Sequence, residues 1–165
     1  MQELVNNLLL ASRIEEGRLH VEYKEFSFPE LAKDVVAEFT PWAQASNIIL
    51  SVQGDEKSAR VNSDPLLVRQ VLENLVDNAV RYVKKGNGET NAIVVRYARV
   101  GEKLEVEVQD TGVGIPVGDQ KFIFQRFFRS SNAARQETQG SGLGLYIAKA
   151  MVKSLGGDMG FESQE

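Results

Sequence analysis

Apolar side chains recur at helical spacing in four stretches of the chain. In residues 4–14 they repeat three and four positions apart, which predicts the end of an amphipathic helix that stops near Gly17. A second helix is expected to begin after Ser27, because Ser27 and Glu30 have the spacing of a capping box. Pro41 should kink or end this second helix, because proline lacks the N–H group that a helix interior uses.

The other two predicted helices lie further along the chain. Asp64 followed by Pro65 is typical of a helix start, and the apolar spacing continues to about Val83. The last helix is expected from about Gly142 to Leu155, with two glycines beyond its end. These two helices also carry the polar motifs that bear on function.

Short stretches in which apolar and polar side chains alternate predict strands between the helices. The predicted strands are residues 19–26, 48–53, 59–62, 93–100 and 104–109. The last two flank a Gly-Glu turn and are expected to form an antiparallel hairpin. Because helices and strands do not alternate strictly, the pattern favours the α+β class, with helices on one face of a mixed sheet.

The segment from residue 111 to residue 141 does not follow these patterns. It has one short helical patch, at about residues 121–128, and is too long for a simple connection. Loops of this length in compact domains are usually functional lids or disordered, and the sequence leaves both interpretations open.

Composition excludes several kinds of chemistry. The 165 residues, 42% hydrophobic and 25% charged, suit one ordinary globular domain. Without cysteine, and with one histidine, the chain has no disulfide, no Cys/His zinc cluster and no thiol nucleophile. A metal ion would therefore be a hard cation bound by oxygen. The net charge of −4 gives no basic field for nucleic acid, and no apolar run approaches the length of a membrane span.

A polar stripe runs along the longest predicted helix. Asn74 and Asn78 lie four residues apart and Arg81 three further on, so all three share one side of the helix. Taken alone, such a stripe is more often a solvated surface than a binding site. Its meaning depends on the motifs that lie downstream in the chain.

Two glycine-rich motifs lie downstream of this helix. Asp110 ends the second hairpin strand and precedes Gly112 and Gly114, which either form a tight turn or let a flat base lie against bare backbone. Residues 140–145, Gly-Ser-Gly-Leu-Gly-Leu, open the last helix and form either a hinge or an anion site made of unpaired N–H groups. No Gly-Lys pair exists, so a Walker-type phosphate loop is not expected.

Together, and about thirty residues apart, these motifs resemble those of sensor histidine kinases. Residues 72–82 (LENLVDNAVRY) resemble the N box and residues 110–116 (DTGVGIP) the G1 box. Residues 124–129 (FQRFFR) are similar to the F box and residues 140–145 to the G2 box. Upstream, residues 4–17 resemble the end of the second helix of the dimerisation and histidine-phosphotransfer domain. The resemblance covers essentially the whole chain.

The resemblance implies a fold and a division of the chain. The fold would be the Bergerat ATP-binding fold, a two-layer α/β sandwich with helices on one face of a mixed, mostly antiparallel sheet. Residues 1–17 would be the end of the phosphotransfer helix and residues 18–165 the catalytic domain, with an ATP lid at about 115–140. The family continues past a strand, here residues 159–162, into a closing strand, so we expect that strand to lack its partner before Glu165.

The resemblance also implies that Mg²⁺ and ATP bind between the N-box helix and the G boxes. Asn78 would give a carboxamide oxygen to Mg²⁺, with Asn74 close to the metal or the phosphates. Arg81 would reach phosphate oxygens, Tyr82 would border the nucleotide, and Asp110 would hold the adenine amine. The other expected nucleotide contacts are Gly112, Gly114, Ile115, Arg129, Gly140, Ser141, Gly142, Leu143 and Gly144.

The expected catalytic residues are Asn74, Glu73 and Arg129. Related ATPases of the gyrase, chaperone and mismatch-repair type carry a water-activating glutamate at the position of Asn74, and a carboxamide cannot take up that proton. This difference favours transfer to a protein side chain over hydrolysis. Arg129 would contact the γ-phosphate, and Glu73 would assist the accepting histidine. Arg126 would either touch phosphate or form an ion pair within the lid.

The implied function is a protein-histidine kinase of two-component signal transduction. It would transfer the γ-phosphate of Mg-ATP to a histidine on a phosphotransfer domain of the same chain or of a dimeric partner chain, upstream of a response regulator. His20 lacks the surroundings of the family's H box, so we expect it not to be the acceptor. The parent protein would be a membrane-anchored homodimer with this domain in the cytoplasm. The alternatives are a noncatalytic nucleotide-sensing or docking module and a water-directed ATPase.

Overall fold

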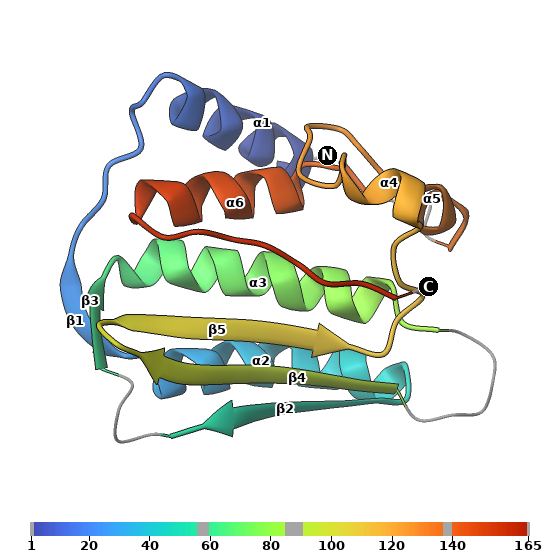
Figure 1. Ribbon diagram of the computed structural model, residues 1–165, viewed down its shortest axis with the longest axis horizontal. Coiled ribbons are helices and arrows are strands. Elements are labelled where there is room, and N and C mark those ends of the chain that lie inside the picture. Colours follow the sequence, from blue (N-terminus) through green and yellow to red (C-terminus); the bar gives the residue numbers. More distant parts are fainter. Residues whose placement is uncertain (1, 56–59, 85–90, 137–139, 165) are drawn as a thin grey trace.

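The computed structural model describes residues 2–55, 60–84, 91–136 and 140–164, in which stacked helices lie beside the larger of two sheets (Figure 1). The helices are α1 (Gln2–Glu15), α2 (Phe28–Ala45), α3 (Pro65–Arg81), α4 (Val117–Gln120), α5 (Ser131–Gln136) and α6 (Gly144–Ser154). The strands are β1 (Lys24–Ser27), β2 (Ile48–Gly54), β3 (Arg60–Ser63), β4 (Asn91–Val100) and β5 (Lys103–Asp110). The expected α+β class is confirmed.

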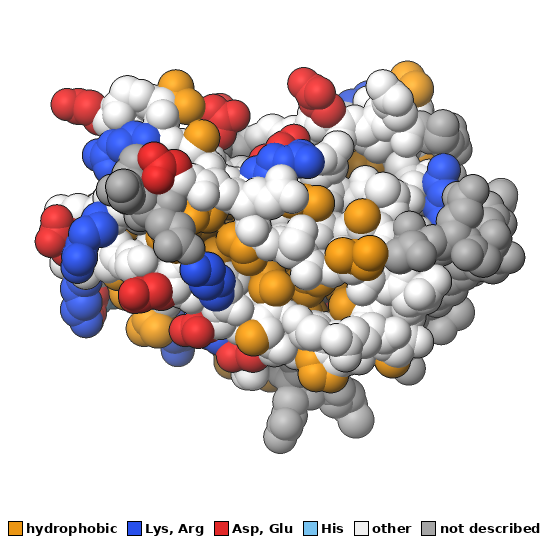
Figure 2. Space-filling model, turned by 90° about the horizontal axis from the view of Figure 1, so that it is seen from below, with side chains coloured by type: hydrophobic (Ala, Val, Ile, Leu, Met, Phe, Trp, Pro, Cys, Tyr) orange, Lys and Arg blue, Asp and Glu red, His pale blue; other side chains and the backbone are white. Residues whose placement is uncertain are grey.

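The strands form two separate sheets. In the larger one, β4 lies between β2 and β5; it is parallel to β2, with Leu50 opposite Ile93, and antiparallel to β5, with Val95 opposite Val108. β1 and β3 form an antiparallel pair at one end of the molecule. The sheet is therefore mixed, as expected, and the β4–β5 hairpin is confirmed. Seen from below, charged side chains of both signs gather at the end that holds β1 and β3 (Figure 2).

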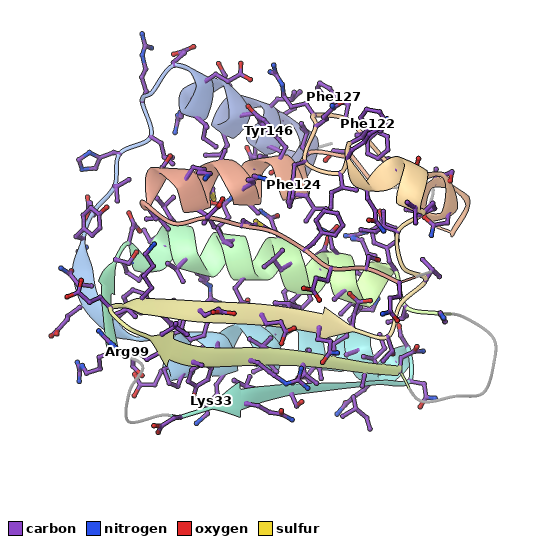
Figure 3. The ribbon with its side chains drawn as sticks, viewed as in Figure 1. Lys33, Arg99, Phe122, Phe124, Phe127 and Tyr146 are labelled. Carbon is purple, nitrogen blue, oxygen red and sulfur yellow. The ribbon has the colours of Figure 1, made fainter. Side chains whose placement is uncertain are left out.

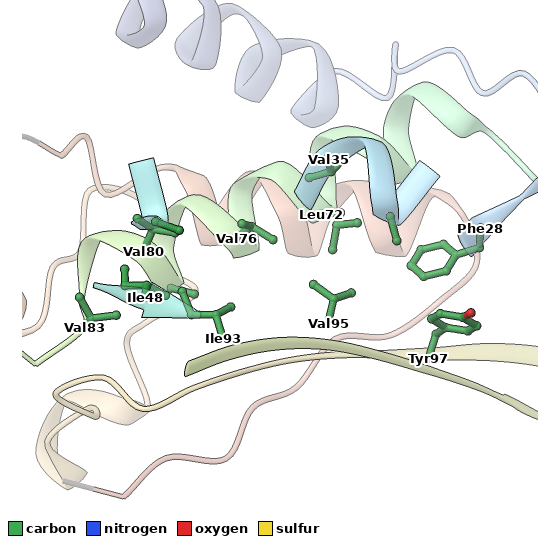
Figure 4. Packing of buried hydrophobic residues seen from close by; sticks show 13 residues of the cluster. Phe28, Val35, Ile48, Leu72, Val76, Val80, Val83, Ile93, Val95 and Tyr97 are labelled. Carbon is green, nitrogen blue, oxygen red and sulfur yellow. The ribbon is translucent and has the colours of Figure 1, made fainter. Parts of the chain in front are cut away.

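The larger sheet and helices α2 and α3 enclose the main core (Figure 4). Alternate residues of β4, such as Ile93 and Val95, meet Leu72 and Val76, which lie one helical turn apart on α3. At one end of this core the ring of Phe28 meets that of Tyr97 edge to face, with 5.4 Å between ring centres. This core fixes α3 against the sheet.

A second core holds α1 and α6 on the other side of α3. Its fully buried members include Leu143, Ile147 and Met151, spaced four residues apart along the start and one face of α6. They pack against Leu67 of α3 and Ala11 of α1.

Among the described residues, no helix combines the length and the apolar composition that a membrane crossing requires.

Asp64 begins α3 as the sequence predicts. Its Oδ1 accepts hydrogen bonds from the N–H groups of Leu66 and Leu67, at 2.9 and 3.1 Å. Its Oδ2 accepts a third from the N–H of Glu22, at 2.8 Å. Burial raises the pKa of Asp64, but these three bonds outweigh it and leave the pKa below its usual value of 3.8. One carboxylate therefore caps α3 and ties the segment after α1 to it.

The predicted strand at residues 19–26 is wrong in its first half, because β1 begins only at Lys24. Leu19 and Val21 instead pack against the second core, and the N–H of Glu22 bonds to Asp64. These contacts pull the segment away from any neighbouring strand. His20 consequently lies in irregular chain, with its side chain exposed.

Two predictions about α2 are corrected. Ser27 occupies the N-cap position, but its side chain makes no capping hydrogen bond, so the expected capping box is not formed. Pro41 does not end the helix, which continues to Ala45. Thr40 directly precedes this proline, and its hydroxyl donates to the carbonyl of Val36 at 2.7 Å. The packing of α2 on the core keeps the helix together.

Two predictions near the end of the chain also fail. The helical patch expected at about residues 121–128 is a series of turns, and the helix lies earlier, at α4; α5 was not expected. Residues 159–162 form no strand. The chain from Gly157 to Gln164 instead runs back along α3 toward the end of β5 without regular structure (Figure 1), and the hydroxyl of Ser163 bonds there to the N–H of Ile115.

Candidate functional site

The side of α3 that faces α6 changes from apolar to polar along its length. Leu67 and Val71 pack in the second core, and Asn74 and Asn78 continue the same stripe at spacings of three and four residues. A Cβ atom at Gly144 would lie 3.7 Å from Oδ1 of Asn74 and 3.8 Å from Nδ2 of Asn78. The structure therefore brings the two asparagines to the first residue of α6.

The first turn of α6 presents backbone N–H groups at this place. Its N-cap residue, Leu143, provides no side-chain cap, and its own N–H donates to the hydroxyl of Ser141 at 3.2 Å. The first N–H groups of a helix lack acceptors within the helix and carry the positive end of its dipole. The start of α6, beside two carboxamides, can therefore bind an anion.

Gly142 is required where the glycine-rich segment meets Phe127, which belongs to the expected lid. Its φ is +67°, and a Cβ atom there would lie 2.7 Å from the carbonyl carbon of Phe127. The N–H of Phe127 donates to the carbonyl of Gly142 at 3.0 Å, and Phe127 itself has a φ of +62° with its ring 60% exposed. Two backbones thus touch where no side chain fits.

Gly112 is required at a second close approach, after β5. A Cβ atom there would lie 2.5 Å from Oδ1 of Asp110 and 2.6 Å from the carbonyl oxygen of Tyr82. The N–H of Gly112 donates to Asp110 at 2.7 Å, and that of Val113 donates to Tyr82 at 3.0 Å. Tyr82 is the C-cap residue of α3, so this turn lies against the end of the helix that carries the asparagines.

Asp110 is the last residue of β5 and lies directly before this turn. Desolvation by the surrounding atoms raises its pKa above 3.8, and the hydrogen bond from the N–H of Gly112 acts in the opposite direction. Asp110 remains exposed to solvent, so its carboxylate can accept a further hydrogen bond, such as one from an exocyclic amine on a ligand.

Arg81 and Glu73, both predicted site residues, are directed toward α2. Arg81 binds Asp77 with 2.7 Å between Nε and Oδ2, and its guanidinium lies 5.2 Å from the ring centre of Trp42 on α2. Glu73 binds Arg69 at 2.8 Å, and Arg69 also bonds to a glutamate of α2. The structure does not bring these two side chains to the start of α6.

The two arginines of the expected lid occupy different places. The guanidinium of Arg129 lies beside Gly140, where a Cβ atom would be 3.5 Å from its central carbon. Arg126 forms an ion pair with Glu15 of α1 and lies 5.5 Å from the ring centre of Tyr146. The ion pair expected for Arg126 is therefore formed, but with α1 and not within the lid.

Tyr146 completes this contact between α1, the lid and α6. It lies between α6 and α1 (Figure 3), and its hydroxyl donates to Oε1 of Glu15 at 3.1 Å. Burial raises the pKa of Tyr146, and the hydrogen bond to Glu15 adds to that effect.

Sequence reasoning missed the side chains that hold the turn after β5. Nδ2 of Asn132 donates to the carbonyl of Gly114 at 2.8 Å, and Nε2 of Gln120 donates to that of Ile115 at 3.0 Å. The N–H of Ile115 donates to the hydroxyl of Ser163 at 2.8 Å. These residues lie in segments without periodicity or a motif, so the sequence offers no signal for them.

A metal ion here would depend on carboxamide oxygens. In the part of the chain that the structure describes, no three acidic or histidine side chains gather to hold a cation. Asn74 and Asn78 beside a helix N-terminus suit a hard cation that keeps waters and arrives with an anionic ligand.

Comparison with known proteins identifies the class. Residues 63–165 match the family described as histidine kinase-, DNA gyrase B-, and HSP90-like ATPase. The chain belongs to this family. It is 31% identical over 161 residues to the sensor protein GacS of Pseudomonas syringae pv. syringae and 34% identical over 168 residues to the histidine-protein kinase BarA of Escherichia coli K12. These matches cover 97% and 98% of this chain but 18% of each relative.

Solved structures confirm the Bergerat fold. The catalytic domain of the histidine kinase ThkA matches with a TM-score of 0.66 at 31% identity, covering 81% of this chain and 82% of that one. The histidine kinase AdeS of Acinetobacter baumannii shares the fold, with a TM-score of 0.79 at 24% identity, covering 99% of this chain and 72% of that one. The resemblance to sensor histidine kinases is therefore confirmed.

Proposed function

We propose that this chain is the ATP-binding catalytic domain of a sensor histidine kinase, which transfers the γ-phosphate of Mg-ATP to a histidine of a phosphotransfer domain. One observation carries the proposal: Asn74 and Asn78 face the first turn of α6 at Gly144. This arrangement pairs carboxamide oxygens for a cation with backbone N–H groups for phosphates.

The triphosphate would lie along the start of α6. Backbone groups of Gly140, Ser141, Gly142, Leu143 and Gly144 would contact its oxygens. Arg129, which rests beside Gly140, would reach the γ-phosphate from the lid. Asn78 and Asn74 would hold Mg²⁺, which supplies neutralisation of charge between the phosphates.

The adenine would lie at the other end of the site, against the turn after β5. Asp110 would accept a hydrogen bond from its exocyclic amine, and the bare backbone of Gly112, Gly114 and Ile115 would let the flat ring approach. Tyr82, whose carbonyl holds this turn, would border the nucleotide. Arg81 would reach a phosphate only by leaving Asp77 and Trp42.

The same stripe favours transfer over hydrolysis. Where hydrolytic relatives place a glutamate, Asn74 offers a carboxamide, which cannot take a proton from water at neutral pH. The nearby carboxylates of Glu73 and Asp77 are paired with arginines on the side of α2. An acceptor imidazole brings its own nucleophilic nitrogen; its bond to the γ-phosphorus forms as the bond to ADP breaks, so catalysis needs mainly positioning and charge neutralisation.

The remaining domain and partner assignments belong to the same proposal. Residues 1–17, which include α1, would end the phosphotransfer helix, residues 18–165 would form the catalytic domain, and about 115–140 its lid. The parent protein would be a membrane-anchored homodimer with this domain in the cytoplasm. A response regulator would receive the phosphate next, in keeping with the structure of ThkA in complex with the response regulator TrrA.

Calorimetry tests the nucleotide site. We expect the non-hydrolysable analogue AMPPNP to bind the chain, more tightly with Mg²⁺ than with EDTA, and Asp110→Asn to abolish most of the binding. Absence of binding, or binding indifferent to Asp110→Asn, would favour the docking module. Multiple-turnover release of phosphate by the chain alone would favour the water-directed ATPase.

A further inference from the structure

The turn from Gly112 to Ile115 is held by groups from five different segments. The N–H of Gly112 bonds to the Asp110 carboxylate and that of Val113 to the end of α3. The carbonyls of Gly114 and Ile115 and the N–H of Ile115 bond to side chains that come later in the chain. Gly114, with a φ of +67°, would otherwise leave the turn free to adopt other conformations.

Asn132 is locked in place by its own hydrogen bonds. Its Oδ1 accepts from the hydroxyl of Ser130 and from the N–H of Ala133, both at 2.8 Å. Its Nδ2 is thereby aimed at the turn, 2.8 Å from the carbonyl of Gly114 and 3.4 Å from that of Val113. All the polar atoms of this side chain serve to connect the start of α5 with the turn.

Ser163 holds the turn from the opposite direction. Its hydroxyl accepts from the N–H of Ile115, and Nε2 of Gln120 lies 3.4 Å from its carbonyl oxygen while donating to Ile115. Two residues earlier, the ring of Phe161 meets that of Phe124 edge to face, with 5.8 Å between centres. The returning segment is therefore anchored on the lid and reaches the turn with its hydroxyl in position.

We propose that Asn132 and Ser163 are positioning residues for recognition of the base. This inference rests on the proposed nucleotide site. Neither residue need touch the ligand: each fixes the backbone that sets the distance between the base and the Asp110 carboxylate. Loss of the hydrogen bonds from either residue therefore weakens the bond between Asp110 and the adenine amine. The proposed phosphate-binding part of the site, at the start of α6, is left unchanged.

IDP carries a carbonyl group where ADP carries the adenine amine. The ratio of the affinities for ADP and IDP therefore measures recognition of that amine separately from binding of the phosphates. Asn132→Asp keeps the acceptor atoms that bond to Ser130 and Ala133 but loses the donor to Gly114. Ser163→Ala removes the hydroxyl, and Ser163→Thr restores it as a matched control. Titrations of the full chain by calorimetry give both dissociation constants, and thermal melting confirms that each variant is folded.

We expect Asn132→Asp and Ser163→Ala each to reduce the preference for ADP over IDP by about fivefold, the value of one ordinary hydrogen bond. The affinity for IDP should stay near that of the wild type, and Ser163→Thr should recover the preference. Equal losses for both nucleotides, or no loss in either variant, overturn the inference. If one variant does not fold, the other decides alone. A wild-type chain without preference for ADP contradicts the proposed base site itself.

Discussion

At the scale of single residues, the Asp110 carboxylate lies where desolvation works against its charge. Its raised pKa means that the folded state holds the proton more tightly than the unfolded chain does. The unfavourable contribution of this group to stability therefore grows as the pH rises through its pKa, which lies above 3.8. The charge of Asp110 therefore lowers the stability of the fold, while its carboxylate is proposed to bind the ligand.

Asp110→Asn should separate these two roles. The asparagine oxygen can still accept the hydrogen bond from the N–H of Gly112. The melting temperature of the free variant should therefore equal or exceed that of the wild type at pH 7. The difference between the two melting temperatures should become smaller toward pH 4. Nucleotide affinity should fall roughly tenfold or more, the value of a hydrogen bond to a charged group. Calorimetric melting across pH, beside titration with ADP, checks both; a variant that melts well below the wild type at pH 7 contradicts this account.

Asp64 shows the opposite pH dependence. Its lowered pKa gives stability that is fully present above its unfolded value of 3.8 and is lost as the pH falls through its folded pKa. Asp64→Ala should lower the free energy of unfolding by about 1–2 kcal/mol at pH 7, because the cap of α3 is lost. Urea denaturation at pH 7 and pH 3 measures this. If Asp64→Ala lowers the free energy of unfolding by the same amount at both pH values, the charge of the Asp64 carboxylate does not contribute to stability.

At the scale of elements, Gly142 and Gly144 at the start of α6 are glycines for different structural reasons. Gly142 has a positive φ and lies against the backbone of Phe127, whereas Gly144 has room for a methyl group beside the asparagines. The first glycine serves the fold of the lid, and the second keeps open the space between α3 and α6.

Gly142→Ala and Gly144→Ala should therefore fail in different ways. The former should destabilise the fold by at least 1–2 kcal/mol, roughly the penalty of a left-handed alanine. The latter should fold like the wild type but bind AMPPNP at least about tenfold more weakly, because its methyl group occupies the phosphate end of the site. Melting and titration of both variants distinguish the two; unaltered affinity in Gly144→Ala would place the phosphates elsewhere.

Periodicity predicted the elements that depend on one buried face. The helices around Leu72 and Ile147 and the β4–β5 hairpin follow from spacing. The approach of Asn74 and Asn78 to α6 was implied by the resemblance to sensor histidine kinases. Residues 19–23 alternate like a strand but use their apolar side chains to cover the second core, which no local pattern reveals. Asn132 and Ser163 act through backbone groups of distant residues, and only the fold brings those together.

At the scale of the whole molecule, α1 is joined both to α6 and to the lid. The second core buries Ala11 of α1, while Val5, Leu8 and Leu9 stay exposed. Glu15 in the last turn of α1 binds Arg126 and Tyr146. The helix proposed to precede the catalytic domain is thus in direct contact with the segment proposed to cover ATP. We expect a change in the position of α1 to shift Arg126, which contacts Glu15.

Glu15→Gln should have little effect on global stability. Exposed ion pairs contribute up to about 1 kcal/mol, and both side chains of this pair are partly exposed, so the free energy of unfolding should fall by no more than that. The amide can still accept the bond from Tyr146, which makes Tyr146→Phe the matched variant for the second contact. Urea denaturation measures both. A loss of several kcal/mol from Glu15→Gln would mean that this contact, and not the apolar core, holds α1 in place.

The destination of the γ-phosphate tests the central claim most directly. The chain is incubated with γ-labelled Mg-ATP and a separate phosphotransfer domain that carries an acceptor histidine, with Asp110→Asn as the control. We predict acid-labile label on the added domain, little free phosphate, and much less labelled domain from the control at the same ATP concentration. Label released as free phosphate over many turnovers, or attached to His20, would contradict the account.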